Sequence, residues 1–568
     1  QPQPACPLTH SNFKRAKNRE YPEIDKRIKE TYIAASTAQK TKVYDMYARF
    51  FRWAADRLDE NGILAFVTNR SFIDSRTFDG FRACAAKEFN EIRIVDLGGD
   101  VRANPKLSGT THNVFGIQTG VAISFMVRRA KQKGCRIFYA RRPEMETAEE
   151  KRSFVGSARL RELAVEELTA DARSNWLAIG GDEFASYLPI ASKESRAAEK
   201  RGSGRTLFKL YSLGVSTNRD DWLYDLRPEL LIKKISYLLN ELRRHVPGSD
   251  QYSNAVKWSE TLKRRAQTSI DEKVSADCIR RAAYRPFFGV VLYQAERLID
   301  RPGAIAEAFP PGGKNVAICF SDVGARTNFV ALATDAPADL HFGSAIDAYQ
   351  QLPRFRFEEG HRIDNITDWS LDQFRKHYQP GRGKKDRPIT KEAIFHYVYG
   401  VLHDPVYREK YALNLKREFP RIPFYPDFWQ WADWGQRLMD LHIGYESVAP
   451  WPLSRSDVPD EKARRAGLPP KALLKADKDA GVIRLDSETT LSGIPPEAWN
   501  YRLGNRSALE WVLDQYKEKT PKDPTIREKF NTYRFADYKD KVIDLLARVT
   551  TVSVETVRIV GAMKSAAR

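Results

Sequence analysis

An aromatic residue next to a glycine, Phe115-Gly116, stands in the middle of the run 113–120, which reads Asn-Val-Phe-Gly-Ile-Gln-Thr-Gly. The run falls between two predicted strands, so it forms a loop at one end of a sheet. A flat apolar ring in such a place can stack on a base that has been turned out of a duplex, and the adjacent glycine allows close approach of the backbone. The same ring could instead pack the loop onto the sheet, and spacing alone favours that ordinary role.

A second group of polar side chains, farther along the chain, has the types that contact DNA. Asn218 and Arg219 come together in one predicted turn. Arginine suits guanine edges and asparagine suits adenine edges in the major groove. Arg285 adds another guanidinium, and Lys384-Lys385 lies in a basic loop suited to phosphates. These five residues are the predicted DNA contacts, and a salt-bridged or solvated surface turn is the alternative for each.

The composition favours a polyanionic partner. The 568 residues include 93 Lys plus Arg against 74 Asp plus Glu, which gives a net charge of +19 and a pI near 9.5. Nucleic acid is the commonest partner for such a surplus, although a basic soluble protein without that role is the alternative. With 42% hydrophobic residues the chain can build real cores, and its length predicts two to four domains.

Cysteine usage and the absence of targeting patterns indicate a cytoplasmic protein. The five cysteines form no CxxC pair or zinc-like cluster, so we expect free thiols in a reducing compartment and no metal site. The first twenty residues contain no apolar stretch typical of a secretory signal, and no apolar run approaches the length of a membrane span. A membrane partner is therefore not expected.

Helical and strand patterns alternate in the first part of the chain. The run 63–68 is continuously apolar, which favours a strand buried on both faces, as in a parallel sheet. Helix and strand in alternation predict a doubly wound α/β fold, and without a preceding half the sheet is incomplete. The predicted helices are 40–58 and 78–89, and the predicted strands are 63–68, 92–97, 121–127 and 137–139.

The rest of the chain has mixed α+β patterns. Strong helices are predicted at 391–402 and 405–419, an exposed helix or linker at 462–479, and a closing helix at 538–549. We predict four parts: the α/β part at 1–142, a helical connector and linker at 143–206, a mixed α+β region at 207–470 and its C-terminal continuation at 471–568.

Several blocks resemble a known family. Three runs, at 43–47, 62–69 and 114–116, resemble successive motifs of the gamma-class adenine DNA methyltransferases. The whole chain resembles the C-terminal half of the single-chain Type ISP restriction–modification enzymes. Further blocks that carry this resemblance are Tyr21–Ile28, Asn113–Ile123, Gly214–Asp220, Ala283–Phe287, Ile394–His403 and Trp499–Gly504.

The resemblance implies a fold, a reaction and roles for two aromatic residues. It implies the distal half of a Rossmann-like methyltransferase sheet followed by a mixed α+β target-recognition region. The implied reaction is methyl transfer from S-adenosylmethionine to the exocyclic amine of adenine in double-stranded DNA. Phe115 would stack on the flipped base, and Tyr47 would lie against the cofactor adenine, although a core aromatic on an amphipathic helix is the commoner fate of such a residue.

The chain departs from the family in one important respect. The family carries an Asn/Asp-Pro-Pro-aromatic tetrapeptide that orients the target amine, and this sequence contains neither that tetrapeptide nor the glycine-rich cofactor loop. Family order places both upstream of Gln1, together with nuclease and motor domains. We therefore expect an upstream catalytic and motor half as partner and little activity from this chain alone. The alternative is a non-catalytic DNA-binding specificity protein that acts with a partner chain.

Overall fold

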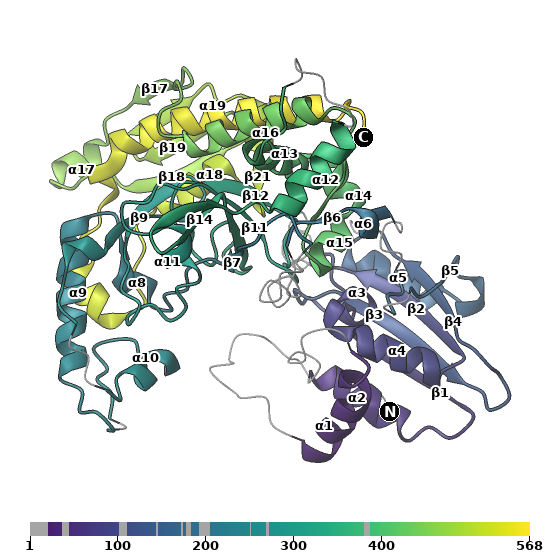
Figure 1. Cartoon of the computed structure of the whole chain (residues 1–568). Helices are drawn as coiled ribbons and strands as arrows, with labels where there is room; N and C mark the ends of the chain where they lie inside the picture. Colours follow the sequence, from purple (N-terminus) through teal and green to yellow (C-terminus); the bar gives the residue numbers. More distant parts are fainter. Residues whose placement is uncertain are drawn as a thin grey trace. The chain divides into compact units, whose positions relative to one another are not determined.

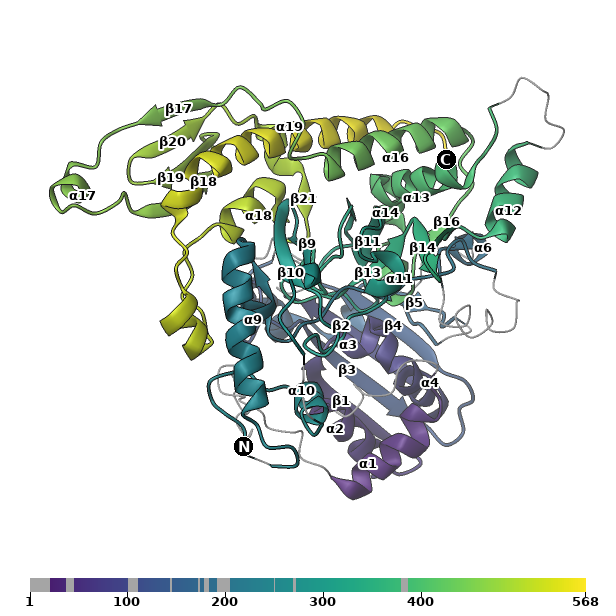
Figure 2. The same ribbon diagram turned by 60° about the vertical axis from the view of Figure 1, so that its left-hand side comes forward.

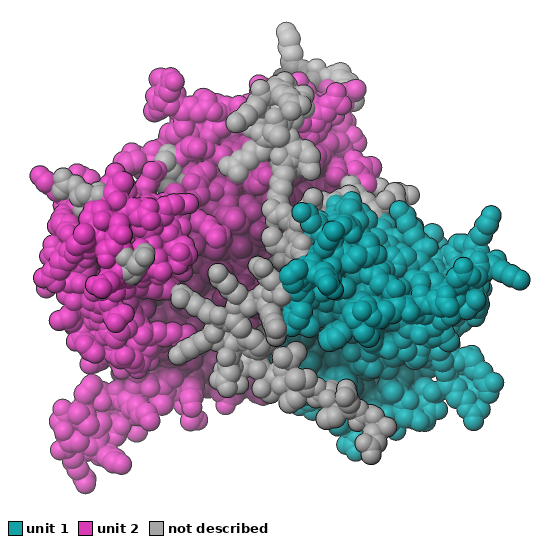
Figure 3. Space-filling model, turned by 90° about the horizontal axis from the view of Figure 1, so that it is seen from below, with its two compact units in different colours: residues 1–181 teal, residues 182–568 magenta. Residues whose placement is uncertain are grey.

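The protein divides into two compact units, residues 1–181 and residues 182–568 (Figure 3). The computed structural model describes residues 21–36, 45–100, 111–143, 146–171, 174–177, 183–191, 205–249, 251–268, 272–379 and 387–568. No helix among these residues is both long and apolar enough to cross a bilayer. Each unit contains both helices and strands, and the strands form several small sheets rather than one large one (Figure 1).

Unit 1 is built around a five-stranded mixed sheet in the order β1-β3-β2-β4-β5. β3 runs antiparallel to both β1 and β2, β2 and β4 are parallel, and β5 is antiparallel to β4. The strands are β1 (Gly62–Asn69), β2 (Glu91–Gly98), β3 (Val121–Arg128), β4 (Arg136–Arg141) and β5 (Glu166–Leu168). The helices are α1 (Pro22–Ile28), α2 (Met46–Ala55), α3 (Ser71–Asp74), α4 (Asp79–Glu88) and α5 (Ala148–Ser157).

Alternating residues of the central strands pack against helices on opposite faces of the sheet. On one face, Ile92 and Ile94 of β2 join a core with Phe51 of α2 and Phe81 of α4. On the other face, Val95 of β2 belongs to a smaller cluster that also includes Phe154 of α5. This two-sided arrangement agrees with the predicted alternation of helices and strands, and each predicted strand is present within two residues of its expected bounds.

The prediction for the first strand was wrong in one respect. β1 is an edge strand paired only with antiparallel β3 among the described strands, and its exposure alternates. The inner face packs on α2, where Phe66 meets Phe51 edge-on at 5.2 Å between ring centroids. Ile63 and Val67 on the other face are 68% and 52% exposed. A continuous apolar run thus shows that a strand has hydrophobic side chains on both faces. It does not show whether another element packs on each face.

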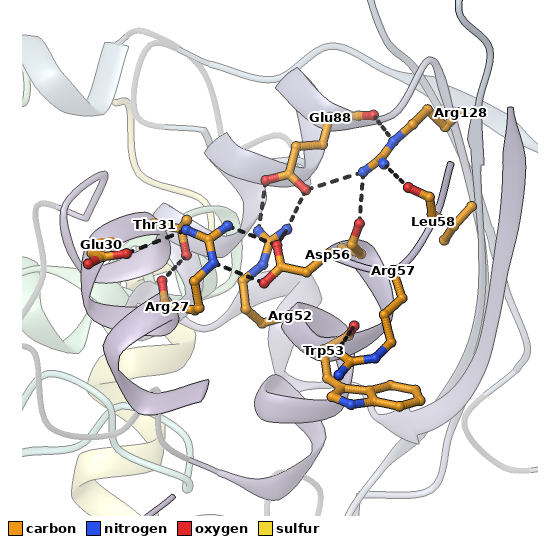
Figure 4. Close-up of polar contacts among 11 residues, drawn as sticks. Arg27, Glu30, Thr31, Arg52, Trp53, Asp56, Arg57, Leu58, Glu88 and Arg128 are labelled. Carbon is orange, nitrogen blue, oxygen red and sulfur yellow. Dashed lines mark hydrogen bonds and ion pairs between the residues drawn. The ribbon is translucent and has the colours of Figure 1, made fainter. Parts of the chain in front are cut away.

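Charged side chains clamp α1, α2 and α4 together at the rim of this sheet (Figure 4). Arg52 of α2 is almost fully buried, donates to both carboxylate oxygens of Glu88 at 2.7 and 2.9 Å, and pairs with Asp56 at 2.7 Å. Arg27 of α1 reaches the same Asp56 at 2.9 Å. Arg128, at the end of β3, lies 3.6 Å from Glu88. One enclosed guanidinium therefore serves two carboxylates from different elements.

Unit 2 begins with short elements that lead into a four-stranded antiparallel sheet, in the order β12-β11-β13-β7, and a three-stranded sheet, in the order β8-β10-β9. The strands of these sheets are β7 (Ser212–Leu213), β8 (Tyr224–Asp225), β9 (Ile279–Arg285), β10 (Phe288–Tyr293), β11 (Ala317–Ser321), β12 (Ala331–Thr334) and β13 (Tyr349–Pro353). The helices around them are α6 (Glu183–Ser186), α8 (Asp220–Leu223), α9 (Pro228–Arg243), α10 (Glu260–Arg265) and α11 (Ile305–Ala308). Two-stranded pairs are β6 (Leu188–Pro189) with β16 (Arg421–Ile422), and β14 (Phe355–Glu358) with β15 (His361–Asp364).

The remaining elements of unit 2 are mostly helical and carry a second four-stranded sheet, in the order β17-β20-β19-β18 (Figure 2). The helices are α12 (Asp368–Tyr378), α13 (Lys391–His403), α14 (Pro405–Lys410), α15 (Ala412–Arg417), α16 (Phe428–Ile443), α17 (Glu461–Arg465), α18 (Ala508–Gln515) and α19 (Lys539–Met563). The strands of this sheet are β17 (Ser454–Asp457), β18 (Ala472–Asp477), β19 (Val482–Asp486) and β20 (Thr489–Ser492). A further antiparallel pair is formed by β21 (Arg502–Leu503) and β22 (Arg506–Ser507).

Two hydrophobic cores hold unit 2 together, and α19 contributes to both. Its first turns, including Leu546, pack in the core that contains the β9 and β10 sheet, whereas Ile559 and Met563 belong to the core around α13 and α16. α13 and α16 cross so closely that a Cβ on Gly400 would lie 2.4 Å from the Trp431 carbonyl oxygen. The C-terminal part of the chain is thus integral to this unit.

The observed boundaries differ from the expected ones. α5 and β5, which fall in the predicted 143–206 connector, extend unit 1, because β5 pairs with β4 and α5 covers one sheet face. The predicted 405–419 helix is two short helices, α14 and α15, and the segment 462–479, predicted as an exposed helix or linker, contains the short α17 followed by β18. The closing helix is real but continues to Met563, because the pattern of buried residues persists along it.

We expect Arg52→Met to loosen unit 1, because it leaves Glu88 and Asp56 without their shared cation. Removing one partner of an enclosed ion pair typically costs about 3–5 kcal/mol, and the partial exposure of both carboxylates places this case near the lower end. Hydrogen exchange of the α2 and α4 amides should accelerate accordingly. Arg57→Met, on an exposed neighbouring arginine that stacks on Trp53, is the control, and equal protection in the two variants would contradict the clamp.

Candidate nucleic-acid interface

The loop that carries Phe115, called the aromatic loop below, follows β2 in unit 1. A buried ion pair lies at the end of β2 where this loop begins. Asp96 is fully buried and accepts hydrogen bonds from Arg70 Nε at 2.9 Å, from Tyr139 Oη at 2.7 Å and from the Gly98 amide at 2.9 Å. Arg70 directly follows β1, and Tyr139 lies in β4. Strands β1 and β2 run in the same direction, so this one carboxylate ties together the strand ends at the edge where the loop begins.

The electrostatics of Asp96 favour its charged form. Burial opposes ionisation, but the charge of Arg70 and hydrogen bonds from Arg70, Tyr139 and Gly98 outweigh it, so the pKa of Asp96 lies below its usual range. The loop returns to the sheet at Gly120, whose carbonyl accepts from the Arg70 amide at 3.0 Å. A Cβ at Gly120 would lie 2.5 Å from the Arg70 side chain, so the close approach requires glycine there.

Asn113 fixes the shape of the loop. This side chain is only 2% exposed, and its amide nitrogen donates to the carbonyls of Gly99 at 3.1 Å and Thr119 at 2.7 Å. Its amide oxygen accepts from the backbone nitrogens of Phe115 at 3.0 Å and Ile117 at 3.3 Å. Four bonds from one buried amide join both sides of the loop and orient the backbone of its apex.

Helix α5 contacts the part of the loop that directly precedes Asn113. Lys151 is fully buried and donates to the His112 carbonyl at 3.0 Å. The Ala148 amide, in the first turn of α5, donates to the Thr111 carbonyl at 2.8 Å. The helix begins with a capping box formed by Thr147 and Glu150, so its first turn is well defined. The described part of the loop is therefore attached at its base, its middle and its flank.

At the apex, Phe115 presents its ring to solvent. The residue is 57% exposed and Ile117 is 40% exposed, and Gly116 between them has a φ of +67°, where glycine carries no strain. The alternative in which Phe115 packs the loop onto the sheet does not describe this geometry. An exposed aromatic ring on a hydrogen-bonded backbone and beside a small residue is a suitable stacking surface for another flat ring.

Tyr47 occupies the first turn of α2. Its ring stacks on Phe78 at 5.3 Å between centroids and 19° between planes, and its hydroxyl is buried without a hydrogen-bond partner among the described residues. Burial first, and then the negative charges of Asp45 and Asp74, raise the pKa of Tyr47 well above its usual value. Side-chain hydroxyls enclosed in a protein normally have a partner. The Tyr47 hydroxyl is therefore available to a group that lies outside the described residues.

Unit 2 contains a cavity of about 760 Å³ next to the predicted DNA-contacting turn. Asn218 is exposed there and adopts a left-handed backbone conformation with a φ of +57°. Its side-chain nitrogen donates to Asp300 at 3.0 Å and its oxygen accepts from Lys257 at 3.3 Å. Asp221 and His341 also line the cavity, so its walls offer amide, ammonium, carboxylate and imidazole groups within one space.

Of the two predicted arginines, Arg219 lines this cavity, and Arg285 pairs with Asp339, another lining residue. The Arg219 side chain is fully enclosed, donates to Ser259 at 2.7 Å and pairs with Asp300 at 2.9 Å. Arg285 is largely buried and pairs with Asp339 at 2.6 Å. Both guanidinium groups are occupied within the protein, so in this structure they shape the walls rather than face outward.

The remaining site predictions have different outcomes. Lys384 and Lys385 lie outside the described residues, and their DNA contact stays a prediction, as do the roles given to Asn218, Arg219 and Arg285. The sequence analysis missed Lys257 as a cavity residue because it lies almost forty positions from Asn218, with no shared spacing. Asn113 was read only as part of a motif, although a buried asparagine at the start of a glycine-containing loop is a typical loop organiser.

Comparison with known proteins identifies the family. A family model described as the Type ISP C-terminal specificity domain matches residues 206–545, which is more than half of the chain and lies entirely in unit 2. The chain belongs to the Type ISP restriction–modification family. The Type ISP match begins just before the β7 sheet and includes the Asn218 cavity. No curated protein sequence matches the chain.

Solved structures of Type ISP enzymes and related complexes are similar to this chain over nearly its whole length. The cryo-electron microscopy structure of the DrdV–DNA complex shares 48% sequence identity with a TM-score of 0.84, over 96% of this chain and 54% of that one. A nuclease-deletion mutant of the Type ISP enzyme LlaGI with a DNA substrate mimic shares 26% identity, with a TM-score of 0.77, over 96% and 50%. LlaBIII bound to DNA, at 22% identity and a TM-score of 0.78 over 96% and 36%, shares the fold. The chain spans about half the length of the first two structures.

Asn113→Ala should release the apex of the aromatic loop. The substitution removes all four bonds of the buried amide, so the amides of Phe115 and Ile117 should exchange hydrogen much faster. The strands beneath should change little, because Asp96 and Arg70 still hold them. Gln118→Ala, an exposed residue of the same loop, is the control. If the apex amides of Asn113→Ala keep their protection, Asn113 does not organise the loop.

Asn218→Gly should weaken sequence discrimination without disturbing the fold. Glycine keeps the left-handed backbone and deletes only the side chain, whereas alanine would add strain. A lost bidentate contact to a base typically costs about 1–3 kcal/mol, or roughly 5- to 150-fold in discrimination. The measurement compares affinity for duplexes enriched from a random library with affinity for unselected duplexes. Asn240→Ala, on the exposed side of α9, is the control, and unchanged discrimination in Asn218→Gly would exclude base reading by this residue.

Proposed function

We propose that this chain forms the target-recognition region and the distal part of the catalytic domain of an adenine-specific DNA methyltransferase. Type ISP membership supports sequence-specific DNA recognition within a restriction–modification system. The finer assignment, methyl transfer to the N6 amine of adenine, is carried by the exposed Phe115 ring on its fixed loop at the end of β2. The whole enzyme includes an upstream catalytic and motor half, which acts as the partner of this chain.

The sheet of unit 1 supports the assignment as part of a Rossmann-like domain. β1 and β2 run in the same direction on either side of antiparallel β3, with helices on both faces. In open α/β sheets, ligands bind beyond the carboxyl ends of such strands. The aromatic loop follows β2 at that edge, and the Arg70–Asp96 pair lies directly beneath it. Further strands of the complete sheet would extend it beyond β1.

Phe115 is suited to hold an extruded adenine. Turning a base out of the duplex costs a few kcal/mol, and stacking on an aromatic side chain returns about 1–3 kcal/mol per base. The ring can provide that energy only if it is already exposed and fixed before the base arrives. The four Asn113 bonds hold the apex backbone, so little ordering remains to be done when the base stacks.

S-adenosylmethionine is the proposed cofactor, and it would supply the methyl group. Tyr47 fits a place beside it, because its buried hydroxyl has no partner among the described residues and its ring is ordered by Phe78. The groups that orient the target amine in this family are not among the 568 residues. Methyl transfer therefore requires those groups from the rest of the enzyme.

The cavity in unit 2 is the proposed place of base reading. Carboxylates accept from the cytosine amine, and amides pair with adenine edges. Asn218 and Asp221 supply these groups, and Lys257 adds a cation for a phosphate or a guanine acceptor. The enclosed Arg219 and Arg285 would fix the positions of these groups and would not contact DNA directly.

The methyltransferase proposal is tested in the enzyme that contains the complete catalytic domain. Phe115→Ala should reduce methylation of plasmid DNA by roughly 5- to 150-fold, the equivalent of about 1–3 kcal/mol of stacking, and Phe115→Trp should restore much of it. With 2-aminopurine at the target position, the fluorescence of the bound complex should rise in Phe115→Ala, because the extruded base loses its stacking partner.

Gln118→Ala is the matched control and should methylate at the normal rate. Unchanged turnover in Phe115→Ala would remove the stacking role. A non-catalytic specificity protein is the competing assignment, because the catalytic tetrapeptide is missing from this sequence. An enzyme with an intact upstream Asn/Asp-Pro-Pro-aromatic block that methylates no DNA would favour it.

A further inference from the structure

A basic arm projects from the second four-stranded sheet of unit 2. We define the α17 arm as residues 458–475, which run from the end of β17 through α17 into β18. Figures 1 and 2 both show α17 at the far end of this sheet, away from the helices that cover its base. The sheet itself is anchored, because Leu474, Ile483 and Leu491 are buried in the main core of unit 2. The arm is therefore an extension of a well-packed element.

Cations outnumber acidic residues in the arm. It contains five cations and two acidic residues, Asp460 and Glu461, and the stretch 462–475 contains no acidic residue. All five cations are exposed. For Arg465, Lys471 and Lys475 there is no carboxylate within 4 Å in the described part of the chain, whereas Arg464 pairs with Glu488 at 3.1 Å. The five cations are Lys462, Arg464, Arg465, Lys471 and Lys475.

The arm holds a defined shape. Asp460 caps α17 by accepting from the Ala463 amide at 3.0 Å, and the Leu468 amide closes the helix on the Ala463 carbonyl at 2.9 Å. Glu488, between β19 and β20, accepts from the Asp460 amide at 2.8 Å and from Arg464 Nε at 3.1 Å. On the returning side, Pro469 and Pro470 restrict the backbone. The cations are thus presented on a preorganised tip.

Two apolar side chains lie among these charges without cover. Val458 is 65% exposed and Leu468 is 63% exposed. Single exposed hydrophobic residues are common on protein surfaces and do not by themselves mark a contact. The exposed cations without a carboxylate partner, held on a preorganised tip, are the features that indicate a contact surface.

We propose that the α17 arm binds the phosphate backbone of the DNA duplex, as a contact separate from the Asn218 cavity. The proposal rests on DNA being the ligand of this Type ISP specificity unit. A phosphodiester backbone is a regular polyanion, and exposed lysine and arginine side chains that have no carboxylate partner bind it by releasing its counterions. Such contacts position the protein on the duplex and carry no base preference. The arm therefore adds affinity and orientation, and the cavity supplies discrimination.

The test compares two fourfold charge-neutralising variants of the 568-residue chain. The arm variant is K462Q/R465Q/K471Q/K475Q. The control variant is K376Q/K410Q/R558Q/K564Q, which removes the same number of lysines and arginines from exposed positions on α12, α14 and the end of α19. Affinity for a random-sequence duplex is measured over a series of salt concentrations. Thermal unfolding of both variants checks that neither substitution set disturbs the fold.

Each arm cation that reaches a phosphate contributes about 0.9 to the slope of log affinity against log salt, so the slope should become shallower by up to about 3.6 in the arm variant. The control slope should stay close to the unchanged chain. An arm variant with an unchanged slope, or two variants with equal losses, would overturn the arm proposal and leave DNA binding by the chain intact. If the unchanged chain binds no DNA, DNA recognition by this unit and the arm contact both fail.

Discussion

The buried carboxylate of Asp96 is the constraint on which unit 1 depends. A charge taken out of water is costly unless a counter-charge and hydrogen bonds accompany it, so Arg70 and Tyr139 must lie where they do once Asp96 is enclosed. Those partners come from the ends of β1 and β4, and the pair therefore fixes three strand ends relative to one another. The position of the aromatic loop follows from that arrangement of strand ends. The hydrogen bonds of Asn113 then determine the direction in which the apex of the loop points.

Unit 2 uses charge in a similar way, but on a larger scale. The ion pairs of Arg219 with Asp300 and of Arg285 with Asp339 join segments that are far apart in sequence, and Arg219 and Asp339 line the cavity. Asn218 and Lys257, which are hydrogen-bonded to each other, are the exposed groups at the same cavity. Cations in unit 2 thus serve two purposes: some hold distant segments in ion pairs, and exposed cations without a carboxylate nearby strengthen the attraction for a polyanion.

The sequence predicted the elements of unit 1 well, because their hydrophobic periodicity is strong, as at Phe51 in α2 and Ile94 in β2. The sequence could not predict which face of a strand is covered by other elements. The apolar run at 63–68 is the same whether or not another layer packs on Ile63 and Val67. The exposed Phe115 followed from motif resemblance rather than from spacing. The enclosure of Arg219 could not be predicted either, since an arginine in a polar turn gives no local sign that it pairs with a distant aspartate, Asp300. Contacts of that kind depend on tertiary pairing.

The unpaired edge of β1 has a practical meaning for work with this chain. Its backbone amides and carbonyls on that side have no strand partner among the described residues. Ile63 and Val67 make the adjoining face of the strand hydrophobic and exposed. Such an edge is a template for pairing with another molecule. When the chain is purified alone, protein concentration becomes an experimental variable, because two copies can satisfy each other's open edges and be mistaken for a native dimer.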